Sequence, residues 1–188
     1  MTQRTVLDSD SRIECYLDEL RRWGARTNLV GSTEIDALRV HILESLAAAR
    51  HFPECARVVD LGSGAGFPGV PLLIVRPDLQ MTLVESRERR VHFLRHVVRT
   101  LELECVVIRG RIEDPPPDPF DYALLRAVAP LARALPLAVP WVAGDGEIWI
   151  WTKEDAEALR AGYAGEISLG ERGRILRVRA AAVSRETL

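Results

Sequence analysis

The stretch Val58–Gly69, with the sequence VVDLGSGAGFPG, constrains the fold more than any other part of this chain. Val58–Leu61 is a short apolar run, rich in β-branched residues, that is typical of a buried parallel strand. The glycines after it allow positive φ angles and let a ligand approach the backbone closely. Pro68 and Pro71 fit a helix only in its first turn, where N–H groups lack helical partners. The stretch therefore predicts a strand, a glycine-rich turn and a helix start, which together can hold a nucleotide cofactor.

The glycine spacing is compatible with two cofactors. The pattern G-x-G-x-x-G over residues 64–69 suggests a dinucleotide, whereas Gly62, Gly64 and Gly66 form G-x-G-x-G, which suggests S-adenosylmethionine. The charge of Asp60, just before the turn, favours the second interpretation. A carboxylate there would repel a pyrophosphate but attract the sulfonium and ammonium groups of the methyl donor. A turn without any ligand is the remaining alternative.

A second acidic residue lies at the position where an acid that binds ribose is expected. Glu85 closes the apolar run over residues 80–84, which has the pattern of a second strand. In folds of this kind an acid about 20 residues after the glycine turn binds the ribose hydroxyls. An ordinary exposed carboxylate at a strand end is the alternative, but the spacing favours the ribose role.

Length and composition fit one globular unit. The chain has 188 residues, of which 47% are hydrophobic and 28% charged, and a net charge of −2. We expect a helical cap over residues 1–54 and a nucleotide-binding core over residues 55–188. No apolar run is long enough to span a bilayer. Three scattered cysteines without a C-x-x-C motif favour a reducing cytoplasm and give no reason to expect a metal site.

Apolar periodicity predicts strands alternating with helices. A capping box at Ser11 and Glu14 predicts a helix that ends near Gly24, and Thr33 predicts the cap of a second helix. The alternation after residue 55 predicts an α/β fold with a doubly wound parallel sheet, in which ligands bind at the carboxyl ends of the strands. Further strands are expected at 105–108, 122–125, 148–151 and, at an edge, 175–179; helices are expected at 70–75, 91–101, 131–139 and 154–161.

The polar residues at the expected strand ends favour chemistry without a general base. Arg126 follows the apolar run 122–125 directly, a place where an arginine has little structural reason to be; a salt bridge to a neighbouring carboxylate is the alternative. The prolines after Asp114 precede that run rather than follow it, which favours a linker. Cys105 fits a strand core and not a nucleophile. These features suit an acceptor with an unshared electron pair, such as guanine N7, for which positioning and electrostatics suffice.

The chain resembles a known family over nearly its whole length. The segments that carry the likeness are Asn28–Leu29, His41–Leu46, Asp60–Pro71, Glu85–Ser86, Arg90–Arg95, Phe120–Asp121, Arg126–Ala129 and Gly170–Arg172. With Phe67–Pro71 after the glycines, they are similar to the bacterial 16S rRNA guanine-N7 methyltransferases called RsmG or GidB.

This resemblance implies a class I, Rossmann-like methyltransferase fold with an N-terminal helical cap. It also implies S-adenosylmethionine as cofactor, 16S rRNA or the small ribosomal subunit as partner, and a cytoplasmic monomer. Gly62, Phe67, Ile112, Glu113 and Arg126 would contact the donor, alongside Asp60, Gly64, Gly66 and Glu85 from the motif analysis. Arg126 and Lys153 would be catalytic, and Arg89, Arg111, Lys153 and Arg172 would face the RNA.

Some positions depart from the family pattern. Gly24 stands where the family usually has Asn, Leu125 where it has Ser, Glu154 where it has Gly, and Gly173 where it often has His. Because Leu125 and Glu154 are expected beside the guanine, two alternatives stay open. One is a methyltransferase of this fold that acts on another RNA or a small molecule. The other is a donor-binding, RNA-associated protein without turnover.

Overall fold

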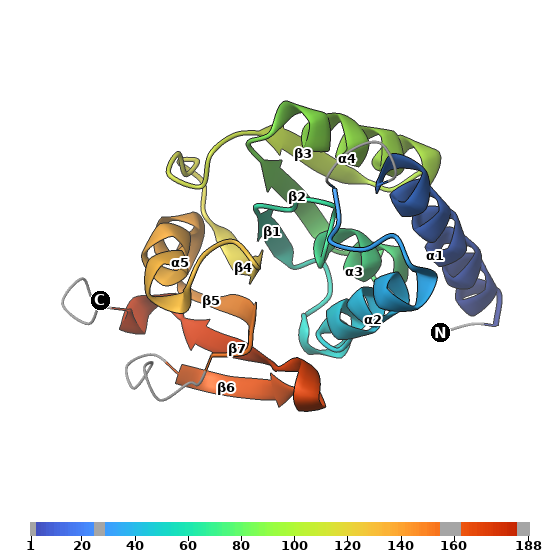
Figure 1. Ribbon diagram of the computed structural model, residues 1–188. Coiled ribbons are helices and arrows are strands. Elements are labelled where there is room, and N and C mark those ends of the chain that lie inside the picture. Colours follow the sequence, from blue (N-terminus) through green and yellow to red (C-terminus); the bar gives the residue numbers. More distant parts are fainter. Residues whose placement is uncertain (1–2, 25–28, 155–162, 184–188) are drawn as a thin grey trace.

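The computed structural model describes residues 3–24, 29–154 and 163–183 and contains a seven-stranded sheet with helices on both faces (Figure 1). The strands are β1 (Arg57–Leu61), β2 (Gln80–Glu85), β3 (Cys105–Arg109), β4 (Phe120–Arg126), β5 (Val142–Thr152), β6 (Tyr163–Ser168) and β7 (Arg174–Arg179). The longer helices are α1 (Gln3–Gly24), α2 (Ile35–Leu46), α3 (Gly69–Val75), α4 (Glu88–Thr100) and α5 (Leu131–Ala138).

The sheet has the strand order β3-β2-β1-β4-β5-β7-β6. Strands β1 to β5 pair in parallel, which confirms the α/β class and the doubly wound arrangement. The sheet is mixed at one end, where β7 runs antiparallel to both β5 and β6. The segment expected at an edge, Ile175–Arg179, is internal, since β6 covers it.

Alternate residues of the central strands enter two separate hydrophobic cores. Val58 is fully buried in the core that α1 to α4 cover, whereas Val59 is fully buried in the core beneath α5. A strand with both faces covered needs apolar residues at consecutive positions, which explains the unbroken run in β1. Because β1 lies in register with both β2 and β4, the carboxyl ends of all three strands meet at one edge.

Helices α1 and α2 pack beside α3, on the face of the sheet opposite α5 (Figure 1). Tyr16 of α1 is completely buried and donates its hydroxyl proton to the carbonyl oxygen of Ala65, 2.6 Å away. The N-terminal helices are therefore tied to the glycine-rich turn itself. The division into residues 1–54 and 55–188 stays a prediction. None of the described helices is both long and apolar enough to cross a membrane.

The helix starts were the least accurate sequence predictions. Helix α1 begins at Gln3, so Ser11 and Glu14 lie inside it and do not cap it. Glu34, and not Thr33, is the N-cap residue of α2, and no side-chain hydrogen bond caps that helix. The expected helix end at Gly24 and the helix through Pro136 are confirmed. Asn28 and residues 155–161 of the last expected helix lie outside the described residues.

Asp60 joins β1 to the start of α3. Its side chain is fully buried, and Oδ2 accepts a hydrogen bond from the N–H of Gly69 at 3.1 Å. A Cβ at Gly69 would lie only 2.7 Å from that oxygen, so the contact requires glycine. Within the described residues, Oδ1 has no hydrogen-bond partner. Burial raises the pKa of Asp60 to about 7, because the charged form is desolvated.

We predict that Asp60→Asn alters how stability depends on pH. The native pKa of about 7 exceeds that of an unfolded aspartate, so Asp60 favours the native state below about pH 4. This contribution to the free energy of unfolding is lost as the pH rises through 7. The total loss in the free energy of unfolding is about 4 kcal/mol. Asparagine can keep the contact with Gly69 but does not ionise. In urea unfolding at pH 5, 6, 7 and 8, the variant should gain stability relative to the parent as pH rises; a constant difference would contradict this.

Candidate active site

Two pockets adjoin at the carboxyl edge of the sheet, with volumes of about 420 and 520 Å³. Both include Ala127 and Ala129 in their walls, so the segment after β4 borders both pockets. The first pocket lies beyond β1, β2 and β3 and is lined by residues that include Gly62, Glu85, Arg90, Arg111, Ile112, Glu113 and Val128. The second pocket lies between α2 and the ends of β4 and β5; its walls include His41, Glu44, Arg126, Trp151, Lys153, Glu154 and Arg172.

Gly62 shapes the wall of the first pocket. Its φ is +71°, and its N–H donates to the carbonyl oxygen of Val84 at 2.8 Å, which joins the turn to β2. A Cβ at this position would lie 3.0 Å from a methyl group of Val128, which lines the same pocket. The backbone conformation therefore favours glycine here, and any larger residue would also have to displace Val128.

Glu85 holds the turn from the side of β2. The carboxylate is buried; Oε2 accepts the N–H of Gly64 at 3.0 Å and Oε1 accepts the N–H of Arg87 at 2.8 Å. Arg90 lies 3.7 Å from Oε2 and balances the charge. The hydroxyl of Ser86 also donates to Oε1, at 3.4 Å. Because each carboxylate oxygen has two acceptor sites, Oε2 can still accept a hydrogen bond from a ligand in the first pocket.

Several predicted donor contacts lie beneath the turn and not in either pocket. Asp60 is under the start of α3, and a Cβ at Gly66 would meet the Tyr16 hydroxyl at 2.9 Å. The Phe67 ring packs 5.6 Å from the Tyr16 ring and 5.5 Å from the guanidinium of Arg126. These residues support the turn, while Gly62, Glu85, Ile112 and Glu113 line the first pocket.

The loop after β3 closes the first pocket on its far side. The carbonyl oxygen of Ile112 accepts the indole N–H of Trp141 at 2.7 Å, which fixes the loop to the layer beneath α5. Arg111 and Glu113 form an exposed ion pair of 3.6 Å at the rim. An exposed pair of this kind stabilises little, so both side chains are available to a ligand.

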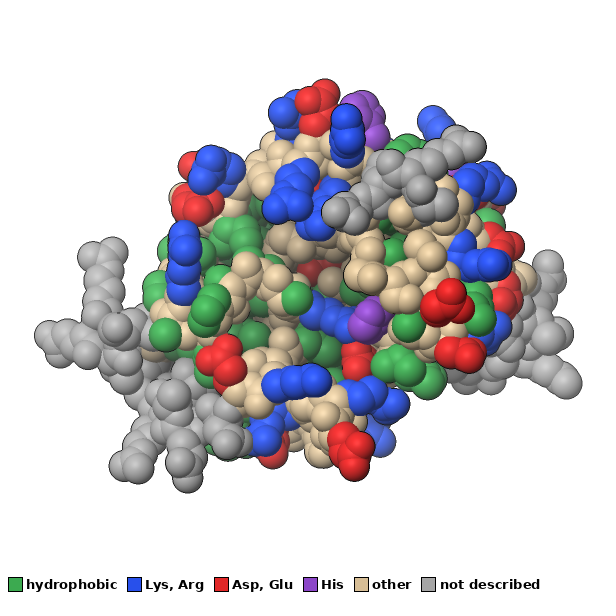
Figure 2. Space-filling model, in the orientation of Figure 1, with side chains coloured by type: hydrophobic (Ala, Val, Ile, Leu, Met, Phe, Trp, Pro, Cys, Tyr) green, Lys and Arg blue, Asp and Glu red, His purple; other side chains and the backbone are tan. Residues whose placement is uncertain are grey.

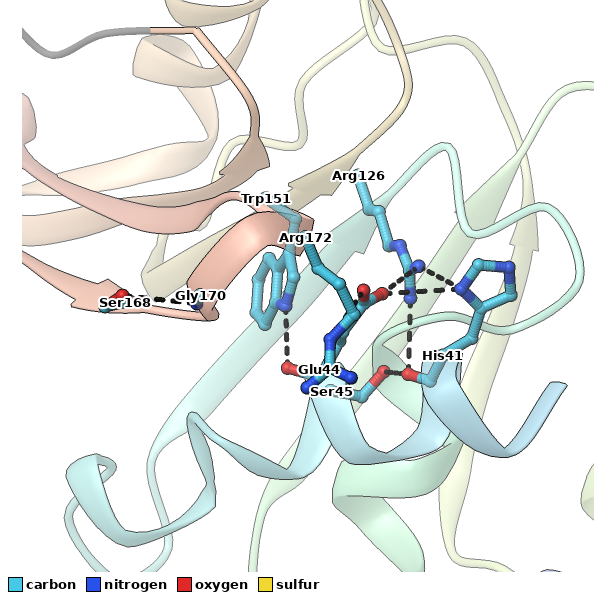
Figure 3. Close-up of polar contacts among 8 residues, drawn as sticks. All are labelled: His41, Glu44, Ser45, Arg126, Trp151, Ser168, Gly170 and Arg172. Carbon is cyan, nitrogen blue, oxygen red and sulfur yellow. Dashed lines mark hydrogen bonds and ion pairs between the residues drawn. The ribbon is translucent and has the colours of Figure 1, made fainter. Parts of the chain in front are cut away.

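Arg126 and Glu44 form the centre of the second pocket (Figure 3). Nη2 of Arg126 lies 2.6 Å from Oε2 of Glu44, and the two side chains are 15% and 10% exposed. The same guanidinium reaches Nδ1 and the carbonyl oxygen of His41. Burial and the nearby Arg126 lower the pKa of His41, so its imidazole is neutral at pH 7 and Nδ1 accepts from the guanidinium. The salt bridge considered as the alternative for Arg126 is thus present, and its role in turnover stays a prediction.

The remaining predicted residues are distributed unevenly. Lys153 and Arg172 line the second pocket, and Arg111 lines the first. Arg89 is exposed on α4 and lines neither pocket. Leu125 is buried in the core beneath α5 and lines neither pocket, so the structure gives it no contact with either cavity. Glu154 does line the second pocket, where Oε1 accepts the N–H of Leu131 at 3.1 Å.

Sequence reasoning missed Glu44 and His41 as site residues. They lie three residues apart on α2, a helix whose other inward positions are largely apolar, and both line the second pocket. A polar pair beside an apolar stripe was the available signal. Among the described residues, no group of three or more His, Cys, Asp or Glu side chains could hold a metal ion.

Comparison with solved structures shows the fold. A structure of MtNAS in complex with MTA and tNA has a TM-score of 0.61 and 17% identity, with 92% of this chain and 70% of that chain covered. The mitomycin 7-O-methyltransferase MmcR has a TM-score of 0.63 and 18% identity, with coverage of 87% and 60%. A mutant of MtNAS in complex with S-adenosylmethionine has a TM-score of 0.61 at 18% identity, with coverage of 92% and 72%. The class I methyltransferase architecture is confirmed.

Comparison with curated sequences shows the family. Proteins named ribosomal RNA small subunit methyltransferase G match from Desulfotalea psychrophila (43% identity over 131 residues), Corynebacterium jeikeium (38% over 169) and Gluconobacter oxydans (41% over 140). The matches cover 66%, 87% and 74% of this chain and 60%, 72% and 72% of the relatives. The profile of the GidB family, described as rRNA small subunit methyltransferase G, matches residues 9–172. The chain therefore belongs to the GidB family of small-subunit rRNA methyltransferases.

Proposed function

We propose that this protein transfers a methyl group from S-adenosylmethionine to N7 of a guanine in 16S rRNA. The observation that carries the proposal is the pair of adjoining pockets separated by Ala127 and Ala129. One pocket can hold the donor and the other can hold a base, so that the reacting atoms meet between them. Family membership supports the substrate class, and the choice of N7 rests on the chemistry of the second pocket.

The residues of the first pocket fit the donor. Glu85 can accept hydrogen bonds from ribose hydroxyls, and Gly62 lines the wall of the same pocket. Glu85 and Glu113 offer negative charge to the sulfonium and ammonium groups, while Arg90 and Arg111 offer positive charge to the carboxylate. When bound, S-adenosylmethionine supplies an electrophilic methyl group.

The second pocket suits a base that needs no deprotonation. Near its centre, Arg126 binds Nδ1 of His41 and Oε2 of Glu44, so Oε1 of Glu44 is the atom of this cluster that is left to contact a base. Guanine N7 has an unshared electron pair at neutral pH, so no proton must leave before attack. The role of the chain is then to position the base and to exclude water, which is where proximity and orientation contribute most.

Positive charge surrounds the site and fits an RNA partner. Figure 2 shows Lys and Arg side chains around the hollowed centre of the face that carries the site. Arg111, Lys153 and Arg172 stand at the two pockets, and Arg89 lies on the neighbouring helix α4. Local clusters of this kind bind phosphates even where the net charge is negative, as it is here at −2. We infer a cytoplasmic protein that acts as a monomer on 16S rRNA or the small subunit.

The first pocket should bind S-adenosylhomocysteine and not NADH. Because Glu85 provides charge-assisted hydrogen bonds to the ribose, Glu85→Gln should weaken binding by about 10-fold or more in calorimetry. Glu88→Gln is a matched control, since Glu88 is an exposed acid at the start of α4 that lines neither pocket. Equal affinity of the Glu85 variant and the parent, with the circular dichroism spectrum unchanged, would contradict the donor assignment.

The product should be 7-methylguanine, formed without an obligatory base. Nucleoside mass spectrometry of small-subunit rRNA should show this nucleoside in cells with the gene and its loss at one position in cells without it. Because N7 needs no deprotonation, the rate at saturating substrates should show no essential ionisation of a base near pH 7. Loss of a methylated adenine or cytosine, with all 7-methylguanine intact, would falsify the N7 assignment.

A further inference from the structure

We propose that Glu44 recognises the Watson–Crick edge of the target guanine in the second pocket. The proposal rests on the proposed function and adds the group that selects guanine over other bases. A base that enters a protein pocket is read by hydrogen bonds to this edge and by flat contacts on its faces. The second pocket offers both kinds of contact.

Glu44 has an acceptor oxygen that the protein does not use. Oε2 is held by Arg126 at 2.6 Å and lies 3.4 Å from Nδ1 of His41. Among the described residues, Oε1 has only one charged neighbour, Nε of Arg172 at 3.7 Å, which is too long for a hydrogen bond. The other acid of the pocket, Glu154, is exposed and accepts the N–H of Leu131 through Oε1. Glu44 is therefore the buried carboxylate of the pocket that can accept from a base.

The carboxylate is held rigidly in place. The indole N–H of Trp151 donates to the backbone carbonyl oxygen of Glu44 at 2.9 Å, and Arg126 holds one side-chain oxygen (Figure 3). The hydroxyl of Ser45 donates to the carbonyl oxygen of His41 at 2.7 Å on the same turn of α2. These contacts fix both the backbone and the side chain of Glu44, so little ordering is needed when a base enters.

The hydrogen-bonding groups of guanine match this carboxylate. Its Watson–Crick edge presents two donors side by side, N1–H and the 2-amino group, and an ionised carboxylate is an acceptor only. Adenine presents the acceptor N1 at the corresponding position, which the carboxylate would repel. The unused oxygen Oε1 has two acceptor sites, so it can accept from both donors of guanine, whereas adenine N1 offers it no donor.

The orientation that results suits attack by N7. In guanine, N7 lies at the opposite end of the purine from the 2-amino group. If the 2-amino group faces Glu44 on α2, N7 is directed away from α2, where Ala127 and Ala129 border the first pocket. Apolar wall residues, among them Pro130 and Leu169, can cover the faces of the ring. The N7 electron pair then forms the new bond to the methyl carbon while the carbon–sulfur bond breaks and its electrons return to sulfur.

The test compares guanine with inosine, which has the same N7 but lacks the 2-amino group. Small-subunit rRNA with either base at the methylated position can be made by ligation of synthetic RNA. With saturating donor, the parent should methylate guanine about 10- to 100-fold more efficiently in kcat/KM than inosine, because inosine keeps N1–H but loses the hydrogen bond from the 2-amino group to the charged carboxylate. In Glu44→Gln, Arg126 holds the amide oxygen and the amide N–H group faces the base, so the ratio should fall to within about 3-fold of one.

Two controls separate recognition from a structural effect. Glu154→Gln changes another acid of the same pocket and should keep the guanine-to-inosine ratio of the parent. Glu14→Gln changes an exposed acid that pairs with Arg39 of α2 and should keep both rate and ratio. The unfolding midpoint and the affinity for S-adenosylhomocysteine of Glu44→Gln show whether its fold and first pocket are intact.

The outcomes are distinct. A parent that does not discriminate against inosine, or a Glu44→Gln variant that keeps the full ratio, would overturn the role of Glu44 while leaving the proposed function in place. A parent that transfers no methyl group to guanine N7 would instead contradict the proposed function, and the inference would fall with it.

Discussion

The site depends on the buried ion pair between Arg126 and Glu44. It joins the end of β4 to α2, two elements that are 82 residues apart at the paired positions. Charges taken out of water are costly unless paired, and removal of one partner from a buried pair typically costs about 3–5 kcal/mol. The pair therefore holds α2 over the carboxyl edge of the sheet and gives the second pocket its wall. It also leaves one oxygen of Glu44 facing that pocket.

The glycine turn depends in the same way on two buried carboxylates. Asp60 holds the start of α3 through Gly69, and Glu85 holds the turn through Gly64. The turn can then follow a path that other residues could not adopt, and the first pocket forms beside it. Ala127, with a φ of +53°, lies in the left-handed region at the border between the pockets. Such strained residues persist only where the surrounding structure determines them, and they cluster at functional sites.

Elements that are marked by a pattern within their own segment were predicted from the sequence. Features that depend on residues far away in the chain were missed. The strands β1, β2 and β4 were identified because two-sided burial requires unbroken apolar runs. Strand β6 was not, because Tyr163–Ser168 has no fully buried residue, contains a glycine and pairs only with β7. The cap at Ser11 was wrong because a capping pattern inside a longer helix has the same sequence as one at its start. Glu44 was missed because its importance comes from Arg126, which lies far away in the chain.

A crystal structure with S-adenosylhomocysteine bound would test the two-pocket account most directly. We predict that the ligand fills the first pocket, that its ribose hydroxyls contact Glu85, and that its sulfur lies toward Ala127 and the second pocket. The Arg126–Glu44 pair should remain, with the second pocket free to receive a base. A ligand bound in the second pocket, or one whose sulfur lies away from Ala127, would contradict the account, because the methyl group could not then reach a base held by Glu44.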